Sequence, residues 1–272
     1  MENIILFLGT GGDSIVVGKQ IKASGGIILE LEGNQFLLDP GPGCLVRARQ
    51  AGISIRNTIG VFVSHAHTNH SNDLNVVLEA LSVSGLDRIG VVVCNKKVVD
   101  GDEKELPVLK NRNRDFVEKV LALGPGAKLG INNINISTTK TKHFDSEGIG
   151  FIFETPRYSI GYTSDTEFTE EIADQYNKCG VLILNCKYPT EMKEPGHLNT
   201  DDAIKFIKKA KPKLAIINHF GIKMIEANPM YEAREIQKET KVETMAAKDG
   251  LLINPVSFSS RMRQITLEPF SE

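Results

Sequence analysis

The feature that most constrains this chain is a cluster of three histidines in the segment Ser64-His65-Ala66-His67-Thr68-Asn69-His70. The β-branched run 59–63 precedes the cluster and predicts a buried strand that leads directly into it. In an extended loop His65 and His67 can point to the same side, because side chains two residues apart share a face. His70 then begins the next helix and faces a slightly displaced point. This layout favours two adjacent metal ions rather than one.

The other three histidines of the chain, His143, His197 and His219, each follow a predicted strand or lie in the loop beyond it. Imidazole nitrogen favours zinc, with manganese and iron as alternatives, and three neutral histidines on one ion leave a position open for water. The pKa of water bound in that position falls to about 7, which provides a hydroxide nucleophile at neutral pH. The six histidines therefore predict a metal-dependent hydrolase.

Two aspartates follow predicted strands and are further candidates. Asp165 comes directly after the run 159–162, where its carboxylate could bridge two metal ions, or where it could instead cap a helix. Asp39 ends the run 35–38, where it could accept a hydrogen bond from a ligand imidazole and fix its tautomer, or could simply form the turn. We expect Asp165 to be a metal ligand and Asp39 to support one.

The order of predicted elements favours an α/β fold with two sheets packed face to face and helices outside. Composition supports a globular chain, since 41% of its 272 residues are hydrophobic, and we expect a single domain over 1–272. The polar stretch 95–115 predicts a long surface loop. Strands are expected at 4–8, 26–31, 35–38, 59–63, 89–94, 131–139, 150–154, 159–162, 181–185, 214–218 and 251–253, and helices at 44–51, 73–81, 170–177, 200–209 and 229–240.

Charge and cysteine content narrow the class of protein. A formal net charge of -2 argues against a dedicated nucleic-acid binder that relies on its overall field. The four cysteines lie far apart and form no paired motif, which is typical of buried thiols in a reducing compartment. The apolar run near the N-terminus is too short to span a membrane and lacks a basic flank. We therefore expect a cytoplasmic protein with no membrane association.

With these residues assembled, the chain resembles the metallo-β-lactamase superfamily of metallohydrolases, and within it the branch of phosphodiesterases similar to tRNase Z. The similarity rests on the histidine cluster, on the segment Leu37-Leu38-Asp39-Pro40-Gly41 and on the early turn Gly9-Thr10-Gly11-Gly12. It rests equally on Gly196-His197-Leu198-Asn199-Thr200 and Asn218-His219-Phe220. This resemblance implies a four-layer αββα sandwich with the metals at the edge where both sheets end.

The resemblance also implies roles for individual residues. Three histidines would hold one metal ion (His65, His67 and His143), two would hold the second (His70 and His219), and Asp165 would bridge the two ions. His197 would not ligate a metal but would stabilise developing charge or protonate the leaving oxygen. The hydroxide between the ions would attack phosphorus or an ester carbonyl, which makes a phosphodiesterase the first expectation.

The sequence departs from the family pattern in two places. The family motif is His-x-His-x-Asp-His, and here Asn69 stands where the Asp belongs. A neutral amide can still coordinate a metal and orient the nucleophile, but the second site loses a charge; Asp73 could replace it only if the helix start reorganised. In bacterial tRNase Z an arm that binds tRNA lies between the residues that match His143 and Asp165. Here the interval between these two residues is 22 residues, which leaves no room for such an arm.

We therefore expect a small phosphodiester or ester as the substrate rather than tRNA, and a homodimer is what the relatives imply. One alternative is a lactonase or another carboxylic-ester hydrolase that uses the same site. Another is an attenuated, non-catalytic metal-binding member, for which Asn69 is the main support. Lys140 and Lys142 flank His143 and could steer an anionic substrate, or could be ordinary surface lysines.

Overall fold

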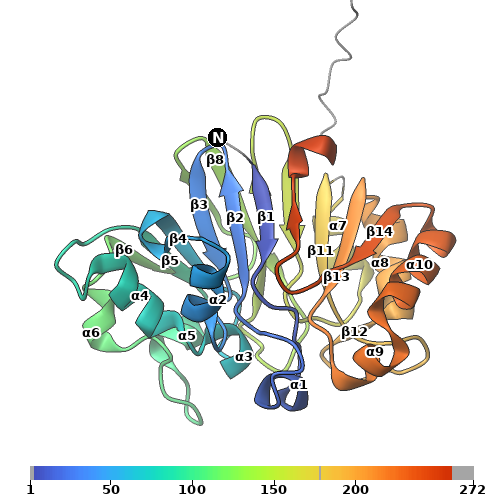
Figure 1. The fold of residues 1–272 in the computed structure, drawn as a ribbon, viewed down its shortest axis with the longest axis horizontal. Coiled ribbons are helices and arrows are strands. Elements are labelled where there is room, and N and C mark those ends of the chain that lie inside the picture. The colour runs from blue at the N-terminus through green and yellow to red at the C-terminus, as the bar shows by residue number, and fades with distance from the viewer. Residues whose placement is uncertain (1–2, 178, 259–272) are drawn as a thin grey trace, which may run out of the picture.

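The computed structural model describes residues 3–177 and 179–258, which form two β-sheets packed face to face (Figure 1). The first sheet is antiparallel across its first four strands and parallel across the rest. In order, its strands are β15 (Leu252–Ile253), β1 (Ile4–Phe7), β2 (Ile27–Leu31), β3 (Asn34–Leu38), β4 (Thr58–Val63), β5 (Val91–Cys94) and β6 (Lys119–Ala122).

The second sheet has the same mixed character, with parallel pairing on one side and antiparallel pairing on the other. In order, its strands are β14 (Glu243–Ala246), β13 (Leu214–Asn218), β11 (Val181–Tyr188), β10 (Ser159–Tyr162), β9 (Ile149–Glu154), β8 (Ile134–Lys140) and β7 (Lys128–Ile131). A short strand, β12 (Leu198–Asn199), pairs with β11 outside this order.

Helices cover the outer face of each sheet (Figure 1). On the first sheet, α2 (Cys44–Gln50), α4 (Leu74–Ser82) and α5 (Lys96–Asp100) contribute buried apolar side chains to one core cluster. On the second sheet the same role falls to α7 (Glu170–Gln175), α8 (Thr200–Ala210), α9 (Ile222–Ala227) and α10 (Pro229–Thr240). The remaining short α-helices are α1 (Ser14–Gly18), α3 (Thr68–Ser71) and α6 (Asn111–Arg114), and there are two short 3-10 helices, η1 (Ile55–Asn57) and η2 (Pro255–Phe258), among the described residues.

A third core cluster fills the space between the two sheets. Phe36 and Phe62 of the first sheet meet Phe153 of the second, with ring centroids 5.7 and 5.0 Å from the Phe153 ring. Along β11 the side chains alternate, so that Ile183 enters this central cluster while Leu182 and Leu184 face the helices. The layers are therefore helix, sheet, sheet and helix, and the predicted αββα sandwich is confirmed.

Local sequence explains how the principal elements begin and turn. Glu32 and Gly33 connect β2 to β3 with positive φ angles of 49° and 82°, the backbone that a tight hairpin turn requires. Asn199 caps α8 by accepting a hydrogen bond from the Asp202 N–H at 2.8 Å. Two lysines in the last turn of α8 complement the negative end of its dipole.

Several expectations about the elements need correction. The stretch 95–115 is not one long surface loop, because α5 and α6 lie within it and Val98 and Leu109 are fully buried. The sequence analysis also missed β6, β7 and β14, which are four-residue strands at sheet edges. Within the described residues, every helix is too short or too polar to cross a membrane.

Candidate metal centre

The histidine cluster lies at the end of β4, beside the end of β3. These two strands are parallel, with Leu38 opposite Phe62, so the residues that follow them emerge at the same edge of the first sheet. His65 and His67 occupy the loop after β4, and His70 lies in α3. Asp39 follows β3, and its N–H donates to the Phe62 carbonyl at 2.7 Å. Register between the two strands thus places Asp39 next to the cluster.

The second sheet delivers its candidate residues to the same edge. Asp165 follows β10 and His219 follows β13, and both strands run parallel to β11, which lies between them. His143 follows β8, which has the same direction as β10 because β9 pairs antiparallel with both. Ligands that are far apart in the sequence meet here because the ends of these strands meet.

Backbone strain accompanies this convergence. Asp39, Ser164 and His219 have φ angles of 48°, 56° and 65°, in the left-handed region that residues other than glycine seldom occupy. All three lie in the loops immediately after β3, β10 and β13. Strained residues of this kind persist only where the surroundings hold them, and they cluster at functional sites.

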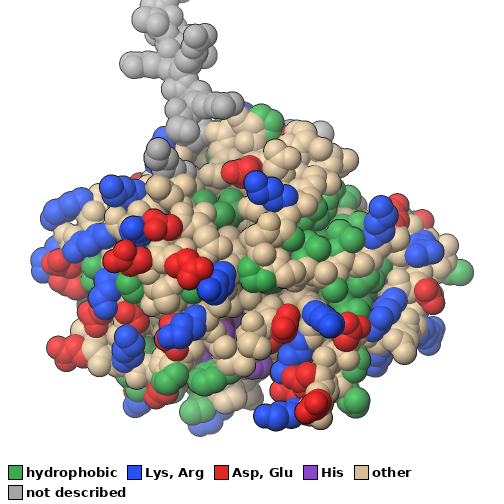
Figure 2. All heavy atoms as spheres, turned by 180° about the vertical axis from the view of Figure 1, so that it is seen from behind, with side chains coloured by type: hydrophobic (Ala, Val, Ile, Leu, Met, Phe, Trp, Pro, Cys, Tyr) green, Lys and Arg blue, Asp and Glu red, His purple; other side chains and the backbone are tan. Residues whose placement is uncertain are grey.

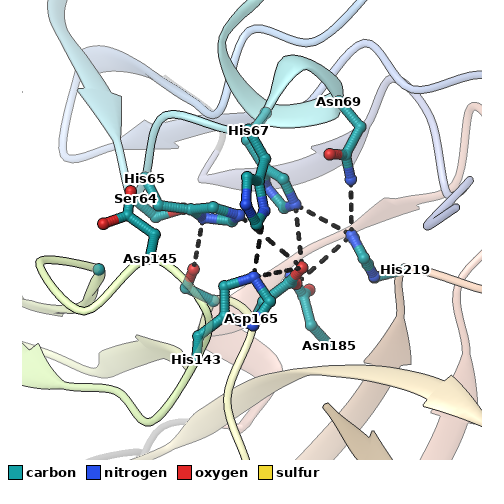
Figure 3. Close-up of polar contacts among 12 residues, drawn as sticks. Ser64, His65, His67, Asn69, His143, Asp145, Asp165, Asn185 and His219 are labelled. Carbon is teal, nitrogen blue, oxygen red and sulfur yellow. Dashed lines mark hydrogen bonds and ion pairs between the residues drawn. The ribbon is translucent and has the colours of Figure 1, made fainter. Parts of the chain in front are cut away.

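Asp165 lies at the middle of the assembled group (Figure 3). Nitrogen atoms from five histidines surround its carboxylate. The distances from Oδ2 are 3.4 Å to His70 Nε2, 3.6 Å to His197 Nδ1 and 3.9 Å to both His65 Nε2 and His143 Nε2, and Oδ1 lies 3.4 Å from His219 Nε2. Asn185, in β11, fixes the carboxylate by donating a hydrogen bond to Oδ1 at 2.7 Å.

The potential ligands divide into two halves that share Asp165. In the first half, ligand atoms of His65, His67 and His143 lie within 4.8 Å of one another, and His67 Nδ1 is 3.1 Å from His143 Nε2. In the second half, His70 Nε2 is 2.9 Å from His219 Nε2. Ring nitrogens that face each other so closely must share either a proton or a bound cation, so each pair can hold a metal ion.

The outer nitrogens of three of these histidines are held by the protein, which leaves their inner nitrogens facing the centre. His143 Nδ1 donates to the Gly196 carbonyl at 2.7 Å, and His65 Nδ1 lies 2.9 Å from Ser64 Oγ. His70 Nδ1 lies 2.8 Å from Asp39 Oδ2. Partners of this kind fix the tautomer and orientation of metal-ligating histidines.

Asp39 is itself embedded in hydrogen bonds and is only 4% exposed. It accepts from the Ser64 N–H at 2.7 Å, from Ser64 Oγ at 2.8 Å and from the Tyr162 hydroxyl at 2.6 Å, in addition to its contact with His70. Asp39 therefore contacts a candidate ligand as well as forming the turn, and it carries a second buried negative charge close to the centre.

Burial and mutual repulsion shape the ionisation of the group. Burial lowers the pKa of His65 and of His219 well below the ordinary value, which keeps these rings neutral and able to ligate. Burial also lowers the pKa of His70, but the charges of Asp165 and Asp39 outweigh it and raise that pKa to about 10. Burial raises the pKa of Asp165, yet the surrounding histidines, His219 first, hold it well below the usual range.

The arrangement fits divalent metal ions on a direct structural test. His65 Nε2 is buried and has no hydrogen-bond partner among the described residues, although it faces the Asp165 carboxylate. Leaving a buried polar atom unpaired is costly, so such an atom usually has a partner. Imidazole nitrogens with one carboxylate are the donor set that zinc and related ions prefer. Figure 2 shows histidine side chains in a recess of the surface, and His67 and His143 are the partly exposed histidines of the group, so solvent reaches its first half.

Asn69 lies in the candidate metal centre, whereas Asp73 lies outside it. The Asn69 amide nitrogen lies 3.0 Å from His219 Nε2, so Asn69 belongs to the second half of the centre. Asp73 instead accepts a hydrogen bond from the Cys44 N–H at 2.9 Å and serves the start of α2. The structure does not bring Asp73 to the place that the family aspartate would occupy.

His197 lies beside the centre, with Nδ1 directed to Asp165 and Nε2 accepting from Lys187 Nζ at 3.1 Å. Burial lowers the pKa of His197 to about 4, with a smaller contribution from Lys187 in the same direction, so the ring is neutral near pH 7.

Lys140 and Lys142 are paired with Glu171 at 3.1 Å and with Glu167 at 2.7 Å, so neither has a free charge to steer a substrate.

The structure brings all the predicted site residues together and adds three that sequence analysis missed. Asn185 and Lys187 lie in the last part of β11, which extends beyond the predicted end at residue 185. Asp145 is 2% exposed and accepts from the Ala66 N–H at 3.0 Å, which braces the loop between His65 and His67. The position of Asn185 and Lys187 at the end of a strand was a signal that could have identified them.

The early glycine turn supports the His219 loop. The Gly12 N–H donates to the Phe220 carbonyl at 2.9 Å, and a Cβ on Gly12 would lie 2.1 Å from the His219 carbonyl oxygen. Only glycine permits that approach. Gly9-Thr10-Gly11-Gly12 therefore acts as a structural turn that packs against a candidate ligand.

Comparison with known proteins places these observations in a family. Residues 34–220 match the model of the β-lactamase superfamily domain. An uncharacterized protein of Methanocaldococcus jannaschii is 36% identical over 92% of this chain and 94% of its own length. A ribonuclease Z of Archaeoglobus fulgidus is 24% identical over 87% of this chain and 94% of its own length. The metallo-β-lactamase fold protein YhfI of Bacillus subtilis superposes with a TM-score of 0.77 at 17% identity, covering 93% of this chain and 99% of that one.

Proposed function

Since the chain belongs to the metallo-β-lactamase superfamily and is a hydrolase of that group, we propose that it uses a dinuclear metal site to cleave a phosphodiester or a related ester. The observation that carries this proposal is the Asp165 carboxylate, which lies within 3.9 Å of nitrogen atoms from five histidines. One carboxylate between two sets of imidazoles can bridge two ions, which a histidine cannot do.

In this proposal each half of the centre holds one divalent ion, zinc first and manganese or iron as alternatives. The first ion would take His65, His67 and His143. The second would take His70, His219 and Asn69, with Asp165 common to both. When bound, such ions polarise the ester and lower the pKa of water to about 7, which supplies the nucleophile at neutral pH.

The other residues would position these ligands and manage charge. Asn185 and Asp39 hold Asp165 and His70 in place through the hydrogen bonds described above. His197 presents its buried Nδ1 toward Asp165, and its Nε2 is occupied by Lys187, so the ring proton belongs on Nδ1. A neutral His197 would therefore stabilise negative charge on the substrate by donating a hydrogen bond.

A phosphodiester is favoured over a neutral ester by charge and by the relatives. Within the described residues the centre has a single carboxylate in direct contact with the histidines' inner nitrogens, so with two divalent ions it keeps a positive charge that attracts an anion. Ribonuclease Z, the name of several relatives, denotes cleavage of phosphodiester bonds. The interval between His143 and Asp165 is taken up by β9 and β10, which supports a small substrate rather than tRNA.

The test is hydrolysis of bis(p-nitrophenyl) phosphate by protein loaded with zinc or manganese, compared with a lactone and with p-nitrophenyl acetate. We expect the phosphodiester to be the preferred substrate and His65→Ala to reduce its turnover by roughly a hundredfold or more. Lys140→Met is the control, since Lys140 is half-exposed and paired with Glu171.

Unchanged phosphodiester turnover in His65→Ala would contradict the proposal. Preference for the lactone would favour a carboxylic-ester hydrolase. No turnover of any of the three esters by fully loaded protein would favour the attenuated metal-binding member.

A further inference from the structure

Lys187 is a half-buried cation beside the metal centre without an anionic partner. Its Nζ lies 3.1 Å from His197 Nε2, and among the described residues no carboxylate oxygen approaches it within 4.0 Å. The lysines nearest His143 in sequence, Lys140 and Lys142, are more exposed and are both neutralised by glutamates. The least exposed of these three cations is thus the one that keeps its charge free.

The hydrogen bond with His197 does not satisfy the Lys187 ammonium group. An ammonium has three N–H donors, and the imidazole nitrogen can accept only one of them. Two N–H groups of Lys187 therefore remain free to donate to another acceptor.

Aromatic rings lie beside Lys187 and His197. The Tyr188 ring centroid lies 6.1 Å from the His197 ring and 5.5 Å from Lys187 Nζ, and the Phe144 ring lies 6.3 Å from His197. Phe144 is 68% exposed and belongs to the loop after β8. The Tyr188 ring covers one side of the ammonium group, which reduces its contact with water and strengthens its attraction for a negative charge.

We propose that Lys187 binds an anionic oxygen of the substrate on the outer side of His197, and thereby makes the centre selective for phosphodiesters over neutral esters. Lys187 is then a substrate-binding residue, and its two free N–H groups donate to a non-bridging phosphoryl oxygen. This inference rests on the proposed function, because it assigns a substrate class to the same site.

The direct test is binding of inorganic phosphate to the metal-loaded protein, measured by isothermal titration calorimetry. We expect Lys187→Met to weaken phosphate binding about tenfold or more, because a charge-assisted hydrogen bond is lost. Lys187→Arg keeps the charge and should bind within about threefold of the wild type. Lys140→Met removes the same charge at a paired site and should bind like the wild type.

The kinetics of ester hydrolysis provide a second readout, which a purely structural role of Lys187 would leave unchanged. In Lys187→Met, kcat/KM for bis(p-nitrophenyl) phosphate should fall about tenfold more than kcat/KM for p-nitrophenyl acetate, mainly through KM. Metal content and thermal melting of each variant establish that it is folded and loaded, and Lys187→Gln replaces any variant that is not.

Phosphate affinity in Lys187→Met within twofold of the wild type would overturn the proposal, as would a wild-type protein that does not bind phosphate. A wild type that binds phosphate through Lys187 but cleaves no phosphodiester would contradict the proposed function and leave this binding role supported. The two failures are therefore distinguishable.

Discussion

The two halves of the candidate metal centre offer similar numbers of potential ligands but different chemistry. The first half is entirely imidazole, with ligand atoms of His65, His67 and His143 within 4.8 Å of one another. In the second half, His70 and His219 are joined by the neutral amide of Asn69, where the family pattern has a carboxylate. Asp165 serves both halves.

The halves also differ in what holds them. His143 of the first half is fixed by a backbone carbonyl, whereas His70 of the second half is fixed by the buried carboxylate of Asp39. The second half therefore depends for negative charge on Asp165 and on Asp39, which does not itself face the common centre. This comparison teaches that two sites with equal ligand counts need not bind metal equally, and we expect the second ion to be the weaker one.

The largest effect should come from the residue that the two halves share. Asp165→Asn keeps the shape of the side chain but removes the charge between five histidine nitrogens. We expect turnover to fall by roughly a thousandfold and both ions to bind more weakly. Metal content and kcat/KM measure this, with Asp249→Asn as a control carboxylate that bonds Thr10 and the Ala23 N–H outside the centre. Loss of only one ion would contradict a bridging role.

A smaller effect is expected from a substitution that weakens only the second half of the centre. Asp39→Asn weakens the support of His70, so affinity for the second ion should fall by about 10–100-fold while the first ion is retained. Calorimetric titration of metal-free protein with zinc resolves the two steps. Asp73→Asn is the matched control, because Asp73 also accepts a backbone hydrogen bond nearby but serves Cys44. Equal loss at both steps would argue against a distinct second half.

The smallest of the three expected effects is a gain in affinity for the second metal ion. Asn69→Asp restores a charged ligand in the second half, and we expect the second ion to bind about tenfold more tightly with the first step unchanged. Asn72→Asp adds the same charge at an exposed position of the same segment and should not change metal binding. If Asn69→Asp leaves the affinity for the second zinc ion unchanged, the neutral amide of Asn69 is not what distinguishes the two halves.

Much of the centre could be predicted from sequence because its ligands follow strands with strong patterns. The run 59–63 and the hairpin of β2 and β3 are short, apolar and bounded by turn residues, so both strand ends could be located. Asp165 and His219 were candidates for the same reason, since each follows a predicted strand, and the resemblance then gave each a role as a ligand. Their convergence depends on the parallel register of β10, β11 and β13, which a single sequence does not display.

What sequence analysis missed was decided by tertiary context. In the stretch 95–115, Val98 and Leu109 stand in short apolar pairs with Val99 and Val108 between charged residues, so no periodic pattern marked them as buried. Edge strands such as β6 present four residues with only partial burial, which resembles a loop. Lys187 looked like any other lysine, and only its contact with His197 and its lack of a described carboxylate partner set it apart.

The central claim is that this chain holds two metal ions in two unequal halves, and metal content tests it most directly. Untagged protein, purified without added metal, would be analysed by mass spectrometry for ions per chain, and again after incubation with zinc and removal of the excess. We predict about two ions per chain after incubation, with the second lost first on dilution against a weak chelator. One ion or fewer per chain after incubation would contradict a dinuclear centre.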